Sequence, residues 1–156
     1  MSDRPRVMIE DYIPCDAIGA ESLRDASAAQ KPPTHRLHVW WARRPLTVSR
    51  AAILASLLPA GARDENWLLE TMGIHGDPVA TRKRLQEANR KGINLGLDPY
   101  GYPRAFTYNP PPTRLSQLQG LCRELWGTDR PVILDPFAGG GSIPFEALRL
   151  GFTIHA

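Results

Sequence analysis

Residues 132–142 read Val-Ile-Leu-Asp-Pro-Phe-Ala-Gly-Gly-Gly-Ser, and they decide the fold of this chain. The apolar run indicates a buried strand, which we place at 131–135, and the acid, proline and glycines indicate a tight ligand-binding turn. Residues 143–150 then have helical spacing, Gly151 ends that helix, and a second apolar run predicts a partial strand at 152–156. The order strand, helix, strand predicts the first β-α-β unit of an α/β fold.

The glycines have a physical reason to stand at this turn. The start of a helix leaves unpaired N–H groups, and a ligand approaches them closely only where no Cβ intervenes. A phosphate loop would end in Gly-Lys-Ser/Thr, whereas this turn ends in Gly141-Ser142-Ile143. The dinucleotide fingerprint needs a small residue at position 144, which is a proline here. Nucleoside triphosphates and nicotinamide or flavin cofactors are therefore disfavoured.

The string Asp-Pro-Phe-Ala-Gly-Gly-Gly-Ser at 135–142 closely resembles the first motif of the S-adenosylmethionine-dependent methyltransferases that modify exocyclic amino groups of DNA bases. In that family the acid and the glycine turn embrace the methionine part of the cofactor. The resemblance implies that S-adenosylmethionine contacts five residues of the turn: Asp135, Phe137, Ala138, Gly139 and Gly141. A tight turn without a ligand is the alternative.

A second string, His-Val-Trp-Trp-Ala-Arg-Arg-Pro-Leu at 38–46, is similar to the N-terminal part of a group of large bacterial and archaeal DNA methylases. These enzymes are described as adenine-specific and are associated with a zinc ribbon. In many amino-methyltransferases a Lys-Pro-Leu element before a helix helps to close the cofactor pocket, and the resemblance gives this part to Arg44 and Pro45. The residues alone leave a second interpretation open, in which the tryptophans anchor the core and the arginines cover it.

The resemblance implies an incomplete Rossmann-like methyltransferase fold of the α/β class, preceded by a mostly helical N-terminal region. We divide the chain into an N-terminal region at 1–59, a helical and loop insertion at 60–112, and the truncated start of the cofactor-binding domain at 113–156. Residues 1–18 read as extended, with an edge strand at 7–9, and 94–112 read as a long loop. Helices are expected at 21–29, 46–58, 64–72, 78–91 and 114–126.

No catalytic residue is assigned within the chain. Amino-methyltransferases catalyse with Asp/Asn-Pro-Pro followed by an aromatic residue that stacks on the flipped base. Asn109-Pro110-Pro111 has the first three residues, but position 112 is a proline, so we interpret this string as a polyproline turn. We expect the catalytic motif beyond Ala156, on the remainder of the methyltransferase polypeptide or on a complementing subunit, and no turnover by this chain alone.

The expected helix 78–91 carries a cluster of basic residues. A basic helix can neutralise phosphates, so DNA is the expected partner of this cluster, although an ordinary solvated helix face fits the pattern equally well. The cluster consists of Arg82, Lys83, Arg84, Arg90 and Lys91.

The composition is that of a soluble intracellular chain. The 156 residues carry a net charge of +3, and 42% are hydrophobic. No apolar stretch approaches the roughly 20 residues of a membrane span and no signal peptide is visible, so we expect a cytoplasmic location without a membrane partner. Cys15 and Cys122 are isolated and read as reduced thiols, His35 and His38 lack a convincing ligand spacing, and we therefore assign no metal site.

The resemblance thus implies that this chain is the cofactor-binding N-terminal portion of a DNA adenine-N6 methyltransferase. Two alternatives stay open. An RNA guanine-N2 methyltransferase fragment would carry a similar glycine turn, and a non-catalytic module that binds nucleic acid or another protein would keep the turn as ancestry only.

Overall fold

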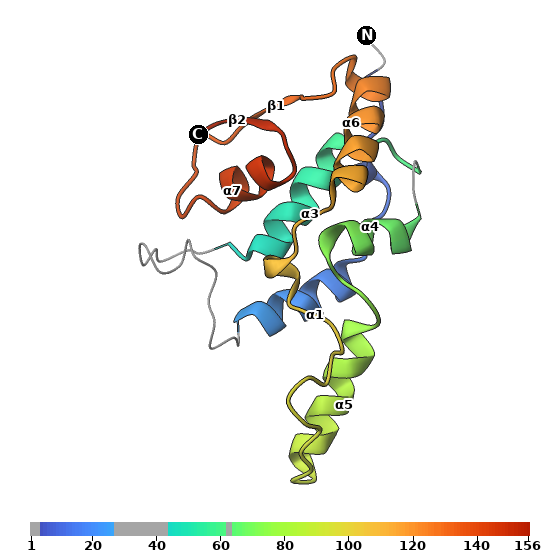
Figure 1. Ribbon diagram of the computed structural model, residues 1–156, viewed down its shortest axis with the longest axis vertical. Coiled ribbons are helices and arrows are strands. Elements are labelled where there is room, and N and C mark those ends of the chain that lie inside the picture. Colours follow the sequence, from blue (N-terminus) through green and yellow to red (C-terminus); the bar gives the residue numbers. More distant parts are fainter. Residues whose placement is uncertain (1–3, 27–43, 62–63) are drawn as a thin grey trace.

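The computed structural model describes residues 4–26, 44–61 and 64–156 (Figure 1). The helices in these ranges are α1 (Cys15–Ala26), α3 (Leu46–Leu57), α4 (Glu65–Met72), α5 (Pro78–Arg90), α6 (Pro112–Trp126) and α7 (Ser142–Arg149). The same ranges contain two 3-10 turns, η1 (Met8–Glu10) and η2 (Ala105–Thr107), and two strands, β1 (Val132–Leu134) and β2 (Thr153–His155). None of these helices is long and apolar enough to cross a lipid bilayer.

The C-terminal part of the chain forms the predicted β-α-β unit. Strand β1 pairs with β2 in parallel, with Val132 opposite Thr153 and Leu134 opposite His155, and α7 connects the two strands. The backbone N–H of Asp135 extends this pairing by donating to the carbonyl of His155 over 2.8 Å. The predicted strand-helix-strand order is therefore confirmed, and the two strands of three residues each form a small parallel sheet in a helix-rich chain.

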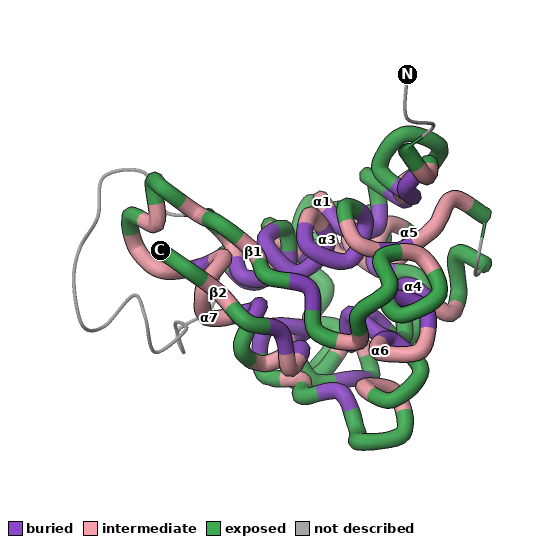
Figure 2. Tube along the Cα trace, turned by 90° about the horizontal axis from the view of Figure 1, so that it is seen from above, coloured by how far each residue is buried: buried purple, intermediate pink, exposed green. Residues whose placement is uncertain are grey.

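Helix α3 forms the centre of the core. It packs against α1 on one side and α7 on the other, and most of its length is buried in Figure 2. Leu54, Ala55 and Leu58 are wholly shielded from solvent. Residues from the segments before and after it join the same hydrophobic cluster: Ile18, Leu68, Met72, Tyr102, Leu118, Ala147 and Phe152.

The extended conformation predicted for residues 1–18 was wrong for 8–10 and 15–18. Met8–Glu10 form a 3-10 turn, Val7 makes only a single bridge to Pro59, and α1 begins at Cys15, six residues before its expected start. The buried face of α1 includes Glu21 and Asp25, and hydrophobic periodicity cannot reveal a helix whose buried stripe contains acids. Residues 27–29 of the expected helix lie outside the described residues.

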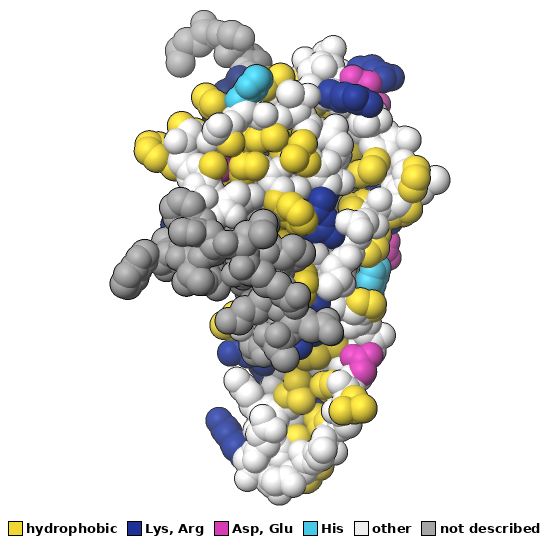
Figure 3. Space-filling view, turned by 60° about the vertical axis from the view of Figure 1, so that its left-hand side comes forward, with side chains coloured by type: hydrophobic (Ala, Val, Ile, Leu, Met, Phe, Trp, Pro, Cys, Tyr) yellow, Lys and Arg dark blue, Asp and Glu magenta, His cyan; other side chains and the backbone are white. Residues whose placement is uncertain are grey.

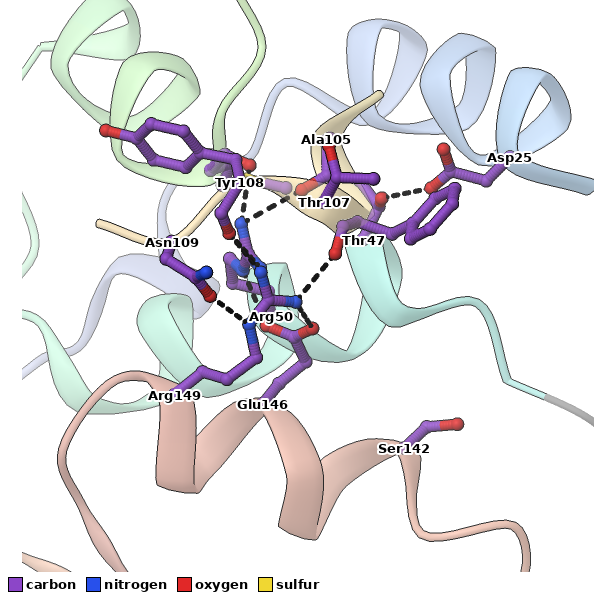
Figure 4. Close-up of polar contacts among 12 residues, drawn as sticks. Asp25, Thr47, Arg50, Ala105, Thr107, Tyr108, Asn109, Ser142, Glu146 and Arg149 are labelled. Atoms are coloured by element: carbon purple, nitrogen blue, oxygen red, sulfur yellow. Dashed lines mark hydrogen bonds and ion pairs between the residues drawn. The ribbon is translucent and has the colours of Figure 1, made fainter. Parts of the chain in front are cut away.

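A buried arginine joins α3, α7 and the chain that precedes α6 (Figure 4). Arg50 is 1% exposed, and its Nε donates to Oε2 of Glu146 on α7 over 2.6 Å. Its two terminal nitrogens donate to the carbonyls of Met72, Ala105 and Tyr108 at 2.8 to 3.3 Å. Every nitrogen of this guanidinium therefore has an acceptor, which a buried charge requires.

Only part of the predicted insertion at 60–112 stands out from the body. Helix α5 and the segment 91–101 that returns alongside it extend to the lower end of the molecule in Figure 1, and we call these residues, 77–101, the arm. Leu68 and Met72 of α4, and Tyr102 after the arm, pack in the common core. The expected helix at 78–91 is confirmed as Pro78–Arg90, capped at its start by the carboxylate of Asp77.

The fold makes a direct prediction about Glu146. This carboxylate is fully buried and faces two guanidinium groups, those of Arg50 at 2.6 Å and Arg149 at 2.7 Å. Replacing it in Glu146→Gln leaves buried Arg50 and partly buried Arg149 without a counter-charge, which costs about 3–5 kcal/mol of the free energy of unfolding. Urea denaturation followed by circular dichroism measures this loss.

The matched control is Glu124→Gln, the same substitution at an exposed position of α6. It is expected to change the unfolding free energy by less than about 0.5 kcal/mol. Equal stabilities of the two variants would show that the buried ion pair does not hold α3 to α7.

Candidate cofactor-binding site

The glycine turn between β1 and α7 has the backbone that the sequence predicted. Gly139 and Gly141 adopt φ angles of 51° and 73°, a region that residues with a Cβ rarely enter. A Cβ on Gly141 would meet no atom within 4 Å, and one on Gly139 would meet only the carbonyl of Phe137 at 3.7 Å. The turn is therefore open on the side where side chains would otherwise project, and a ligand can reach its backbone.

The start of α7 offers hydrogen-bond donors to this open side. The N–H of Gly141 already donates to the carbonyl of Ala138, and Pro144 has no N–H. The N–H groups of Ser142 and Ile143 remain, and no side chain in the described part of the chain caps them. Two uncapped donors at the positive end of a helix favour a carboxylate or another anion.

Asp135 supplies the opposite charge at the same turn. Its Oδ1 accepts the N–H of Phe137 at 3.1 Å, whereas its Oδ2 has no hydrogen-bond partner among the described residues. The next aromatic ring, that of Phe137, is 90% exposed. One carboxylate oxygen and one aromatic face are thus free to contact a ligand, while Ala138 contributes only its backbone carbonyl to the turn.

The two strings that the sequence singled out meet in space. The hydroxyl of Ser142, which is 5% exposed, donates to the backbone carbonyl of Arg44 over 2.8 Å. Pro45 follows as the N-cap of α3, and the side chain of Arg44 is exposed. The backbone of Arg44 therefore lies beside the start of α7, while residues 38–43 of that string lie outside the described ranges.

A buried acid, Asp25 of α1, was missed in the sequence analysis and contacts the first turn of α3 through Thr47. Asp25 is 6% exposed, its Oδ2 accepts a hydrogen bond from the hydroxyl of Thr47, and its Oδ1 has no partner within the described ranges (Figure 4). Burial raises the pKa of Asp25 to about 6, against the hydrogen bond from Thr47, which lowers it. The one available signal was the spacing of Glu21 and Asp25, which places two acids four positions apart on one helix face.

An apolar hollow adjoins the turn between α3 and β1, where Asp135 ends the strand. Ligands of open α/β sheets bind at the carboxyl ends of the strands. Asp135, which follows the carboxyl end of β1, lines the hollow at that position. Its lining residues come from three elements: Ala52, Ile53, Ser56 and Leu57 of α3, Val132 to Asp135, and Ile143 of α7.

Asn109 lies away from this turn. Its Oδ1 accepts a hydrogen bond from Nε of Arg149 over 2.9 Å, at the last residue of α7, whereas the glycine turn precedes the first. Eight helical residues separate the two ends by roughly 10 Å. Pro112 begins α6, as a proline in the first helical position commonly does. These contacts give the Asn-Pro-Pro-Pro string a structural role.

The basic cluster of α5 is remote from the turn as well. All five of its residues lie on the arm, at the other end of the molecule from the β-α-β unit (Figure 1). Arg84 is tied to the carbonyl of Pro99 at 2.9 Å, and Arg82 is only partly exposed. Lys83, Arg90 and Lys91 are exposed.

Within the ranges 4–26, 44–61 and 64–156, no three His, Cys, Asp or Glu side chains gather as metal ligands. Cys15 is exposed and Cys122 is buried, both as free thiols, and burial raises the pKa of Cys122 to about 11. His35 and His38 lie outside these ranges.

Comparison with known proteins assigns no activity. A family described as a protein of unknown function (DUF1156) matches residues 12–88, just under half of the chain. This range contains α1, α3 and α4 and most of α5, and ends well before the glycine turn. Neither a curated protein nor a solved structure matches the chain.

The raised pKa of Asp25 predicts a pH dependence of stability. An acid whose pKa is higher in the folded chain than its usual 3.8 stabilises the fold when protonated, and this contribution is lost as the pH rises through about 6. Asp25→Asn mimics the protonated acid, so the variant should gain on the parent between pH 4 and 7, by on the order of 1–3 kcal/mol.

Urea unfolding of both proteins at pH 4, 5, 6 and 7 tests this expectation. The stability difference should be smallest at pH 4 and largest above pH 6. A difference that is constant over this range would mean that Asp25 is not protonated preferentially in the folded chain.

Proposed function

We propose that this chain is the cofactor-binding N-terminal portion of a DNA adenine-N6 methyltransferase that uses S-adenosylmethionine. The single observation that carries the proposal is the open glycine turn at the carboxyl end of β1, with uncapped donors on one side and a carboxylate on the other. S-adenosylmethionine supplies an activated methyl group, and its methionine part carries one carboxylate and one ammonium.

The charges of the turn suit those of the methionine part. The N–H groups of Ser142 and Ile143 would bind the cofactor's carboxylate at the positive end of α7. The free Oδ2 of Asp135 would accept a hydrogen bond from its ammonium, an interaction between charged groups worth about 1.5–3 kcal/mol. Phe137, exposed beside them, would cover the cofactor's apolar atoms.

The neighbouring contacts support the same reading of the fold. We propose that a Rossmann-like methyltransferase domain begins with β1, α7 and β2. The chain just before α3 lies beside the turn, where the Arg44 carbonyl accepts the hydrogen bond from Ser142. Val132 and Leu134 on β1 are 61% and 72% exposed. Parallel sheets are covered on both faces, so we propose that further elements of the methyltransferase pack here.

The catalytic residues are proposed to come from elsewhere. Asn109 already accepts a hydrogen bond from Arg149 and is remote from the turn. Methyl transfer to an amino nitrogen needs a group that accepts developing charge beside the methyl donor, and no described residue at the turn other than the cofactor ligand Asp135 provides one. We assign that role to the remainder of the methyltransferase polypeptide or to a complementing subunit.

Isothermal titration with S-adenosylmethionine tests the proposal. The parent chain is expected to bind, and Asp135→Asn should weaken binding by about 10- to 150-fold, because it removes the charge that faces the ammonium. An asparagine oxygen can still accept the N–H of Phe137, so the turn keeps its conformation.

Asp129→Asn is the matched control. This partly exposed acid follows α6, pairs with Arg123 of that helix and has no contact with the turn. It should leave the affinity unchanged. Absence of binding by the folded parent chain, or equal affinities of parent and Asp135→Asn, would overturn the proposal.

A further inference from the structure

The arm is a braced projection. Its helix of 13 residues is roughly 20 Å long, and the returning segment is fixed to it by the hydrogen bond from Arg84 to the carbonyl of Pro99. Two side chains tighten the returning segment, since Asn94 accepts the N–H of Gly96 and Asp98 accepts that of Gly101. A projection braced in this way presents its tip in a defined position.

The arm and the three residues that follow it, 102–104, carry a net positive charge. Residues 77–104 contain six basic and three acidic side chains, which equals the +3 of the whole chain. Lys83 and Arg90, seven positions apart, share one face of α5, and Lys91 follows at its end. All three are exposed, and Glu87 is the acid among them.

The tip of the arm is apolar. Ile93, Leu95 and Leu97 are 52%, 37% and 107% exposed, directly after Arg90 and Lys91. Figure 3 shows hydrophobic atoms at the surface of this lower end, with basic atoms nearby. Three exposed aliphatic side chains within five residues, none of them part of the core cluster, form an exposed apolar patch. Such a patch marks an interaction site.

The surroundings of the tip select that occupant. Lysine is depleted at protein–protein interfaces, and here Arg90 and Lys91 border the apolar tip, with Lys83 two helical turns back along α5. Proteins that bend DNA combine this pattern of basic side chains on phosphates with an aliphatic wedge between base steps.

We propose that the arm docks on a DNA duplex, with Lys83, Arg90 and Lys91 on phosphates and Leu97 inserted as a wedge between bases. This inference rests on the proposed function for the choice of DNA, but it concerns a surface remote from the glycine turn. The arm fixes the register of the duplex on the protein, and the wedge unstacks one base step.

The phosphate contacts are tested by fluorescence anisotropy with a labelled 20-base-pair duplex at several salt concentrations. Three phosphate contacts predict a slope of log K against log salt of roughly −3. A triple variant, Lys83→Gln with Arg90→Gln and Lys91→Gln, should lose most of this slope. Glu87→Gln removes a repelling charge and should tighten binding. A parent chain that does not bind the duplex overturns the proposal.

The wedge is tested with 2-aminopurine in the duplex, whose fluorescence rises when the base unstacks. The parent should raise the fluorescence, and Leu97→Ser should abolish the rise while keeping the salt slope. Because Leu97 is fully exposed, this variant folds normally. Leu148→Ser, at an exposed position of α7 outside the arm, is the matched control and should behave as the parent.

The remaining outcomes separate this inference from the proposed function. Duplex binding that is unaffected by Leu97→Ser or by the triple variant would overturn the role of the arm, whatever the cofactor titration gives. Self-association of the parent that Leu97→Ser abolishes, without duplex binding, would make the tip a protein interface instead. S-adenosylmethionine binding measured on Leu97→Ser should equal that of the parent in every case.

Discussion

The ion pair between Arg50 and Glu146 is the interaction on which the arrangement of this chain depends. It joins residues 96 positions apart, and the remaining donors of Arg50 bind three backbone carbonyls from the ends of α4 and the segment before α6. Arg149 binds the same carboxylate and the carbonyl of Phe106. A buried pair of this kind stabilises little in itself, but it selects one packing, because any other leaves a charge unpaired.

The same pair determines where the candidate site lies. By fixing α7 to α3 along the middle of both helices, it allows the first residue of α7 to meet the chain just before α3, where Ser142 binds the carbonyl of Arg44. The glycine turn is then presented between the carboxyl end of β1 and an apolar hollow. A buried ion pair within the hydrophobic core thus positions a turn that itself contains few stabilising contacts, and this division is common at binding sites.

The elements that could be predicted from the sequence are those that depend on local residue patterns. The apolar run, the glycines and the helical spacing after them predicted the β-α-β unit, and the helix expected at 78–91 is α5. The start of α1 was missed because its buried face carries Glu21 and Asp25, and acids read as surface residues. For the same reason Arg50 could not be recognised as a core residue, and the exposure of Leu97 followed only from the projection of the arm. The meeting of Arg44 with the turn was expected from the methylase resemblance and not from the residues alone.

Amide nuclear magnetic resonance during titration with S-adenosylmethionine tests whether the turn at 139–143 binds the cofactor. If it does, the N–H signals of Ser142 and Ile143 shift most, together with those of Gly139 to Gly141, while signals of the arm stay in place. Shifts confined to other parts of a folded chain, or none at cofactor concentrations that saturate methyltransferases, would contradict cofactor binding at the turn.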